Sequence, residues 1–176
     1  MRLPALGASL VLFVAAAAQV PGWKTYSYPA DGFSVSFPLE PKIQSKDLPM
    51  PSGGTAETRM YQLGLGPNGA DGGVMVGMFH FGAFAPGKGP DQVLQDAKNG
   101  ALAQTQAHLL SEKKITLGDA QGLEMVAENA TFHVKARLFV SGTRVYSVME
   151  VYPIGKAFAH AEEFLDSFRI VPAGAK

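Results

Sequence analysis

The chain contains no cysteine among its 176 residues. This absence excludes disulfide bonds, catalysis by a thiolate and a lipid-modified cysteine at the start of a mature chain. Charge is also scarce, because charged residues make up only 17% of the sequence and divide into 15 basic and 15 acidic side chains. Proteins that bind nucleic acid normally carry a basic excess, since neutralising phosphates supplies most of their affinity. The composition therefore argues against nucleic acid as a partner.

Motifs that carry catalysis are missing as well. The Gly-x-Ser-x-Gly turn that exposes a nucleophilic serine does not occur. Neither the zinc motif His-Glu-x-x-His nor the phosphate-binding Gly-Lys-Ser/Thr is present. We therefore predict a protein that is not an enzyme, and we nominate no catalytic residue, no cofactor and no dedicated metal ligand.

One long apolar run is present, and it lies at the N-terminus. Arg2 precedes the apolar residues 3–14, and four alanines at 15–18 follow. A basic start, a short apolar core and small residues are typical of a secretory signal peptide. We predict that residues 1–18 are removed, and that the mature protein is periplasmic or secreted with no membrane span. Two alternatives stay open: a buried helix, and a retained anchor, for which the run is shorter than the roughly 20 residues of a membrane-spanning helix.

The remaining sequence predicts one domain. Hydrophobic residues make up 47% of the chain, which at this length is enough for an ordinary core. The domain covers residues 23–172, after a short extension at 19–22 and before a flexible tail at 173–176. Two stretches rich in glycine and proline, Pro49–Gly54 and Gly66–Gly73, predict connections between strands.

Alternating residues predict the first strands. The stretch 33–37 reads Phe-Ser-Val-Ser-Phe, so its apolar residues share one face and its serines the other, and Pro38 ends the strand. Because this is a regular strand and not a sharp turn, its serines are interpreted as scaffold. Residues 57–65 alternate less clearly. Residues 74–81 are apolar on both faces, which is typical of a central strand that is covered on both sides.

Apolar residues spaced three and four apart predict two helices. The first begins at Pro90, a favourable residue for the first helical position. Its apolar stripe consists of Leu94, Ala97, Ala101 and Leu102. The residues expected to face water are Asp96, Lys98 and Gln104. The second runs from about Lys156 to Ser167, and the apolar residues on its buried side are Phe158, Ala161, Phe164, Leu165 and Phe168.

Residues 123–140 predict an antiparallel hairpin around Asn129. A loop of two or four residues gives one register, whereas a loop of three would mix the two faces of the strands. The predicted pairs on one face are all apolar: Leu123 with Ala136, Met125 with Val134, and Ala127 with Phe132. We call this side of the sheet the inner face, and the opposite side the outer face.

A second hairpin extends the first into a three-stranded meander. A two-residue turn with Gly142 in its first position fits a type II′ turn. The predicted pairs on the inner face are Val140 with Val145, Ala136 with Met149, and Val134 with Val151. On the outer face Lys135 lies between Glu124 and Glu150, which predicts a salt-bridged row and not the paired carboxylates of a glycosidase.

The four histidines form no recognisable metal motif, because no two of them stand four residues apart. They are His80 at the end of a strand, His133 in the meander, and His108 and His160, which we expect on helices. A metal site built from distant ligands stays an alternative, with a histidine joined by Asp31, Asp71 or Asp119.

The outer face of the meander carries an unusual mixture of aromatic, basic and aliphatic residues. Its members are Val126, His133, Lys135, Arg137, Phe139, Tyr146, Val148, Glu150 and Tyr152. One interpretation is that a helix covers part of this face and completes a three-layer α/β/α sandwich. The other is a contact surface for a protein partner, whose candidate binding residues are His133, Lys135, Arg137, Tyr146 and Tyr152.

The order of these elements resembles a known family. Trp23 and Tyr26 precede the stretch Gly-Phe-Ser-Val-Ser-Phe-Pro at 32–38, a helix and the meander follow, and Glu162–Val171 reads EEFLDSFRIV. This pattern resembles the PsbP-like proteins, small exported bacterial proteins that share their fold with the PsbP subunit of photosystem II and with a Ran-binding nuclear import factor. The resemblance implies an α+β fold, with a mostly antiparallel sheet covered by helices on both faces. It also implies an accessory or assembly role without catalysis.

Two functional hypotheses follow. The first is an exported, non-catalytic protein that binds another envelope protein through the outer face. The second is a periplasmic protein that binds a small ligand or a metal, with a pocket between the sheet and a helix. An enzyme stays in question only if His80 or His133 lies beside a carboxylate in a deep cleft.

Overall fold

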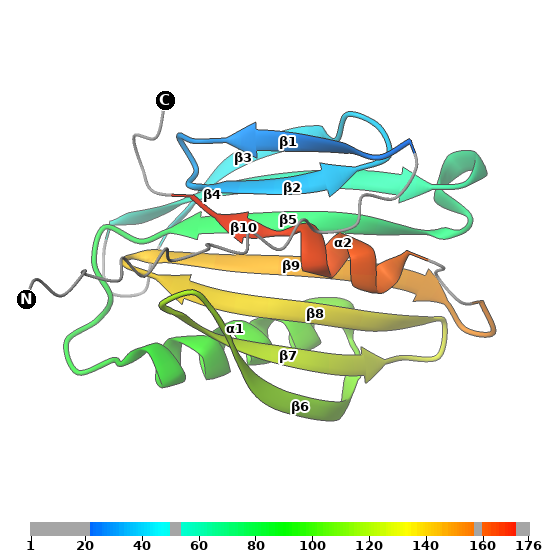
Figure 1. The fold of residues 1–176 in the computed structure, drawn as a ribbon. Coiled ribbons are helices and arrows are strands. Elements are labelled where there is room, and N and C mark those ends of the chain that lie inside the picture. Colours follow the sequence, from blue (N-terminus) through cyan, green and yellow to red (C-terminus); the bar gives the residue numbers. More distant parts are fainter. Residues whose placement is uncertain (1–21, 50–53, 157–159, 172–176) are drawn as a thin grey trace, which may run out of the picture.

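The computed structural model describes residues 22–49, 54–156 and 160–171, whose arrangement is shown in Figure 1. The elements in chain order are β1 (Lys24–Tyr28), β2 (Phe33–Phe37), β3 (Lys42–Pro49), β4 (Thr55–Leu65), the 3-10 turn η1 (Pro67–Gly69), β5 (Gly72–His80), α1 (Pro90–Thr105), β6 (His108–Leu117), β7 (Ala120–Glu128), β8 (Phe132–Ser141), β9 (Arg144–Pro153), α2 (Ala161–Ser167) and β10 (Arg169–Ile170). The predicted signal peptide, the tail at 173–176 and Phe158 lie outside the described residues. Within those residues, no helix has the length and apolar character needed to cross a membrane.

Two antiparallel sheets form the centre of the fold. The larger has the strand order β3-β4-β5-β9-β8-β7-β6, and the smaller has the order β1-β2-β10. Helix α1 packs on the inner face against β7 and β8, whereas α2 packs on the outer face against β9 and β2 (Figure 1). This arrangement confirms the α+β class, with a mostly antiparallel sheet covered by helices on both faces. The smaller sheet shares the outer face with α2, a feature that the sequence pattern does not reveal.

Strand β2 places its alternating residues as predicted. Phe33, Val35 and Phe37 are 0% exposed and belong to the largest apolar cluster, which also holds the buried face of α2. The serines lie on the other side of the strand, and the backbone N–H of Ser36 donates to Ser167 Oγ over 3.0 Å. The alternation therefore marks a scaffold strand that joins the smaller sheet to α2.

The meander has the predicted faces, but one of its two registers is shifted. Between β8 and β9 every predicted pair is present, with Gly142 at a φ of 58° in the connecting turn. Between β7 and β8 the predicted register was wrong by two residues, because Leu123 pairs with Leu138 and Met125 with Ala136. The side chain of Asn129 explains the shift. Its Oδ1 accepts hydrogen bonds from the backbone N–H groups of Thr131 and Phe132, and its own backbone N–H donates to the carbonyl oxygen of Phe132, so the turn lies one residue further along the chain than predicted.

Other boundaries differ from the predictions in ways that tertiary contacts explain. Strand β6 begins at His108, so the prediction of a helical His108 was wrong, and β7 begins at Ala120 after a short turn. The prediction that Lys98 faces water was also wrong, because Lys98 is only 9% exposed. Its ammonium donates to Glu112 Oε2 over 2.6 Å and so joins α1 to the edge strand β6.

Residues 64–69, where β4 leads into β5, read Gly-Leu-Gly-Pro-Asn-Gly and so match the dinucleotide-binding pattern Gly-x-Gly-x-x-Gly. In that motif the glycines precede a helix whose N-terminus binds the pyrophosphate. Here they join two antiparallel strands through η1 alone. The stretch is therefore a hairpin connection and not a phosphate site.

Candidate ligand-binding pocket

Local residues define both ends of helix α1, and a side chain from the hairpin between β7 and β8 holds its C-terminal end. Gly89 precedes Pro90, whose missing N–H costs nothing at the first helical position. At the other end Gln106 adopts a left-handed conformation with a φ of 51°. There the Asn129 side chain also donates a hydrogen bond of 2.9 Å to the carbonyl oxygen of Thr105. The hydrogen bond of Asn129 therefore ties the end of the helix to the hairpin below it.

A pocket with a volume of about 560 Å³ lies between α1 and the sheet. It forms because α1 packs chiefly on β7 and β8, so the inner face of β5 and β9 is left partly open. The helix lines this space with the small residues Ala97, Gly100 and Ala101. Gly100 lies at the exposed rim of the pocket, and a Cβ atom added there would meet no other atom within 4 Å.

Most of the residues that line the pocket are apolar. The helix and the segment before it contribute Phe81, Phe84, Ala85, Lys88, Val93, Asp96, Ala97, Gly100, Ala101 and Gln104. The sheet contributes Met60, Met75, Phe79, Leu138, Val145, Ser147 and Met149. Methionine and phenylalanine side chains thus form much of the wall. Methionine is flexible and polarisable, so it adapts to ligands of irregular shape.

Gly77 shapes the floor of the pocket. It lies on β5 between Met60 of β4 and Ser147 of β9, which both line the space. A Cβ atom at this position would come within 3.0 Å of Phe79 Cε2 and 3.2 Å of Met60 Sδ. Glycine at position 77 therefore allows the side chains of Phe79 and Met60 to lie across the strand.

The charged residues of the lining are Lys88 and Asp96, and they bind each other. Lys88 Nζ donates to Asp96 Oδ2, and Gln92 Nε2 donates to Asp96 Oδ1 over 3.1 Å. The hydrogen bond from Lys88, followed by that from Gln92, holds the pKa of Asp96 below its usual range. Among the described lining residues the positive and negative charges therefore cancel at one end of the pocket.

Comparisons with known proteins agree with this architecture. No protein-family model and no curated protein matches the chain. The solution structure of cyanobacterial PsbP (CyanoP) from Synechocystis sp. PCC 6803 matches with a TM-score of 0.54, covering 90% of this chain and 98% of that chain at 11% identity. The chain has a PsbP-like fold. A crystal structure from Bacteroides thetaiotaomicron VPI-5482 covers 88% of this chain and 51% of that chain at 15% identity, and its TM-score of 0.43 supports no further conclusion.

The outer face of the PsbP-like fold is largely covered, which changes the meaning of its aromatic residues. Tyr146 is 1% exposed, and its hydroxyl donates to the carbonyl oxygen of Asp31 over 2.9 Å. The expectation that Tyr146 contacts a partner was therefore wrong, because the smaller sheet and α2 bury it. His133 and Tyr152 lie side by side with ring centroids 5.3 Å apart and are partly exposed. A role for these two residues in binding a partner stays a prediction.

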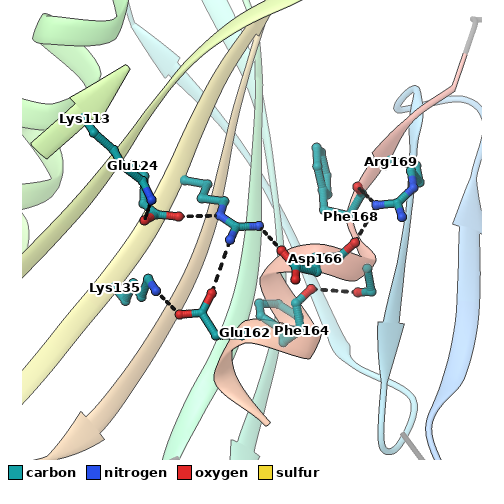
Figure 2. Close-up of polar contacts among 10 residues, drawn as sticks. Lys113, Glu124, Lys135, Glu162, Phe164, Asp166, Phe168 and Arg169 are labelled. Atoms are coloured by element: carbon teal, nitrogen blue, oxygen red, sulfur yellow. Dashed lines mark hydrogen bonds and ion pairs between the residues drawn. The ribbon is translucent and has the colours of Figure 1, made fainter. Parts of the chain in front are cut away.

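Arg137 joins the sheet to α2 through Glu124, Glu162 and Asp166, which Figure 2 labels. Its Nε donates to Glu124 Oε2 over 2.7 Å, and its Nη1 donates to Asp166 Oδ1 over 2.6 Å. Lys135 donates to Glu162 Oε1, on the same helix. Both basic side chains, predicted as partner contacts, are thus occupied in holding α2 against the sheet. A second role for them in binding a partner stays a prediction.

Glu150 does not take part in the salt bridges that the sequence predicts for it. It pairs with Lys135 in the register of β8 and β9, but the ammonium of Lys135 binds Glu162 instead. Glu150 is 1% exposed, and neither carboxylate oxygen has a hydrogen-bond partner among the described residues. Burial raises the pKa of Glu150 to about 7, although the nearby positive charge of Lys135 lowers it. This buried acid lies on the outer face and is separate from the pocket.

The histidines lie next to carboxylates, but outside the pocket. His133 Nδ1 is 3.1 Å from Glu128 Oε2, and His80 Nδ1 is 3.6 Å from Glu57 Oε2. Neither histidine lines the space between α1 and the sheet. In the part of the chain that the structure describes, no group of three or more His, Asp or Glu side chains is arranged to hold a metal ion.

The sequence predicted that some of the lining residues face inward and offered a pocket between the sheet and a helix as one hypothesis, but it did not say which residues line that pocket. Ala97 and Ala101 form part of the predicted apolar stripe of α1, and Met149 is part of the predicted inner face. A stripe of small residues is compatible with close helix–sheet packing and equally with a space below the helix. Gly100 lowers helix propensity, and it is the one feature of the local sequence that indicates a space below the helix.

Proposed function

We propose that this protein is an exported, non-catalytic binding protein that holds a small apolar molecule between α1 and the inner face of its sheet. The observation that carries the proposal is the pocket of about 560 Å³. Ligand sites in proteins are typically about 300–1,000 Å³ and mostly apolar, with a few polar groups that fix orientation. The pocket meets this description, since its few polar side chains stand among phenylalanine, methionine and alanine.

The energetics favour an apolar ligand. Each methylene group that moves from water into such a site contributes about 0.8 kcal/mol. Burying a polar group without a hydrogen-bond partner costs roughly 1–3 kcal/mol, as judged from protein mutations. Across the middle of the pocket only Ser147 offers a side-chain hydrogen bond, so a strongly polar ligand would lose more in desolvation than it gains.

The absence of catalysis and the export of the protein are further parts of the proposal. Export rests on the signal-like sequence of residues 1–18. A non-catalytic role rests on the missing motifs and on the position of His80 and His133 outside the pocket. The PsbP-like fold supports an accessory role of this kind, in which the loaded protein serves another component of the envelope.

Filling the pocket from the helix side is expected to abolish ligand binding without harming the fold. Gly100 lines the pocket at its exposed rim and an added Cβ meets no atom within 4 Å, so in Gly100→Leu the new side chain has room to cover the opening. Binding of the neutral fluorescent dye N-phenyl-1-naphthylamine should weaken at least tenfold. The free energy of unfolding should stay equal or rise by about 0.5–1 kcal/mol, because glycine is unfavourable inside a helix.

Gly100→Ala is the matched control for this experiment. It brings the same gain in helix propensity but adds only one methyl group, so its affinity for the dye should stay within threefold of the wild type. Fluorescence titration measures the binding, and urea unfolding measures the stability. Equal binding by the wild type and Gly100→Leu would contradict the proposal, as would a wild-type protein that does not bind the dye.

A further inference from the structure

The pocket has a definite length. On the helix side its lining residues run from Val93 to Gln104, which corresponds to about 16 Å at ~1.5 Å per residue. On the sheet side they run along β9 from Val145 to Met149, which corresponds to about 13 Å at ~3.3 Å per residue. Both walls therefore extend for several times the width of a hydrocarbon chain.

The two walls follow the same line. Near the start of α1, Val93 packs in one cluster with Val145 and Phe79. Near its end, Ala101 packs in another cluster with Met149. The lining residues therefore follow α1 from one cluster to the other, and we call the space that they enclose the channel.

The channel carries no surplus charge. Lys88 and Asp96 are the charged lining residues, and they form an ion pair. An anionic head group would have to displace Asp96 from Lys88, leaving that carboxylate only its hydrogen bond from Gln92, and a cationic head group would have to displace Lys88 from Asp96. Either exchange breaks an ion pair that the protein already has, so a charged head group gains little over staying in water. Deeper in the pocket, where the lining is apolar, an unpaired charge is strongly disfavoured. A neutral ligand leaves the pair intact and still finds hydrogen-bond donors and acceptors at this end.

We infer that the ligand is an uncharged, elongated hydrocarbon chain with a hydrogen-bonding end group, lying along α1 with that group at the Lys88–Asp96 end of the channel. The inference rests on the proposed function and adds the shape and charge of the ligand. An extended chain advances about 1.2 Å per bond, so roughly 11 to 13 carbons fill the channel. A long-chain alcohol, or the neutral ester or amide of such a chain, has this chemistry.

The test is a competition experiment on the full chain with the bound dye as reporter. Displacement by 1-hexanol, 1-octanol, 1-decanol and 1-dodecanol is measured below the concentrations at which these alcohols aggregate. Affinity should rise about fourfold for each added methylene, the factor that corresponds to ~0.8 kcal/mol. The rise should stop in 1-tetradecanol, whose chain is longer than the channel.

Three ligands of ten carbons test shape and charge, with each affinity compared with that of 1-decanol after correction for partitioning between water and octanol. The compact neutral alcohol 1-adamantanol should bind at least tenfold more weakly than 1-decanol, and so should decanoate and decylammonium. Tight binding of 1-adamantanol would overturn the channel, and tight binding of decanoate or decylammonium would overturn the neutral ligand. In either case, loss of binding in Gly100→Leu would still support the proposed pocket. If no compound binds, or if Gly100→Leu binds them all like the wild type, the proposed function itself fails.

Discussion

Replacing Glu150 with glutamine is expected to raise the free energy of unfolding at pH 8 by about 3 kcal/mol. The wild-type protein should lose stability as the pH rises from 4.5 to 7, and the variant should lack most of this loss. Glu150 is buried below α2, and neither of its carboxylate oxygens has a partner among the described residues. Burial raises the pKa of Glu150 from 4.5 to about 7. Glutamine has nearly the same shape and carries no charge at any of these pH values.

The direction of the effect follows from which state holds the proton. Between pH 4.5 and pH 7 the folded protein keeps a proton on Glu150 that the unfolded chain releases, so stability falls as the pH rises. Below pH 4.5 both states are protonated and the full stability is present. Above pH 7 the folded state contains a buried charge, and the contribution is lost.

Urea unfolding of the wild type and of Glu150→Gln across this pH range measures the effect. Glu163→Gln is the matched control, because it makes the same substitution on the exposed side of α2. It should leave the pH profile within about 0.5 kcal/mol of the wild type, as surface substitutions normally do. Parallel profiles for the wild type and Glu150→Gln would show that Glu150 is charged in the folded protein at neutral pH.

Replacing Asp31 with alanine is expected to destabilise the protein by about 2–4 kcal/mol, because it removes the partner of two groups at once. Asp31 is 3% exposed and lies in the turn between β1 and β2. Its carboxylate accepts hydrogen bonds from the buried hydroxyl of Tyr61 and from the guanidinium of Arg59, both on β4. Burial, followed by the hydrogen bond to Asp31, raises the pKa of Tyr61, so its hydroxyl stays a donor at every accessible pH.

A double-mutant cycle separates this bond from the loss of packing. Tyr61→Phe removes only the hydroxyl, and in that background Asp31→Ala should cost at least 1 kcal/mol less than in the wild type, because no buried donor is left unpaired. Urea unfolding of the four proteins gives the coupling free energy. Additive losses would show that the stability contributed by Asp31 does not depend on the hydroxyl of Tyr61.

The meander shows what local sequence can and cannot specify. The register of β8 and β9 was predicted because Gly142 permits one tight turn that also matches the two apolar faces. The register of β7 and β8 was not, because moving the turn by one residue along the chain keeps the same faces, and the choice depends on the hydrogen bonds of Asn129 within the turn. Alternation determines which face a residue occupies, whereas side-chain contacts in the turn determine its partner.

The candidate site depends on distances that no local pattern contains. Ala97 and Ala101 were predicted to be buried, but the height of α1 above the sheet depends on contacts at its ends, such as that of Asn129 with Thr105. The cover of the outer face likewise depends on parts of the chain that are distant in sequence. Tyr146 and Arg137 were predicted as contacts for a partner, and the chain supplies its own cover for them through α2 and the smaller sheet.

Nuclear magnetic resonance of methionine methyl groups tests the location of the ligand most directly. The sequence contains 7 methionines, of which Met60, Met75 and Met149 line the channel. Met78 lies on the same strand as Met75 but packs in the cluster of the outer face. When N-phenyl-1-naphthylamine is added to protein labelled at the methionine methyl carbons, the aromatic ligand should shift the signals of Met60, Met75 and Met149 and leave that of Met78 in place. Unchanged signals from the three lining methionines, or a shift at Met78 alone, would contradict a ligand site between α1 and the sheet.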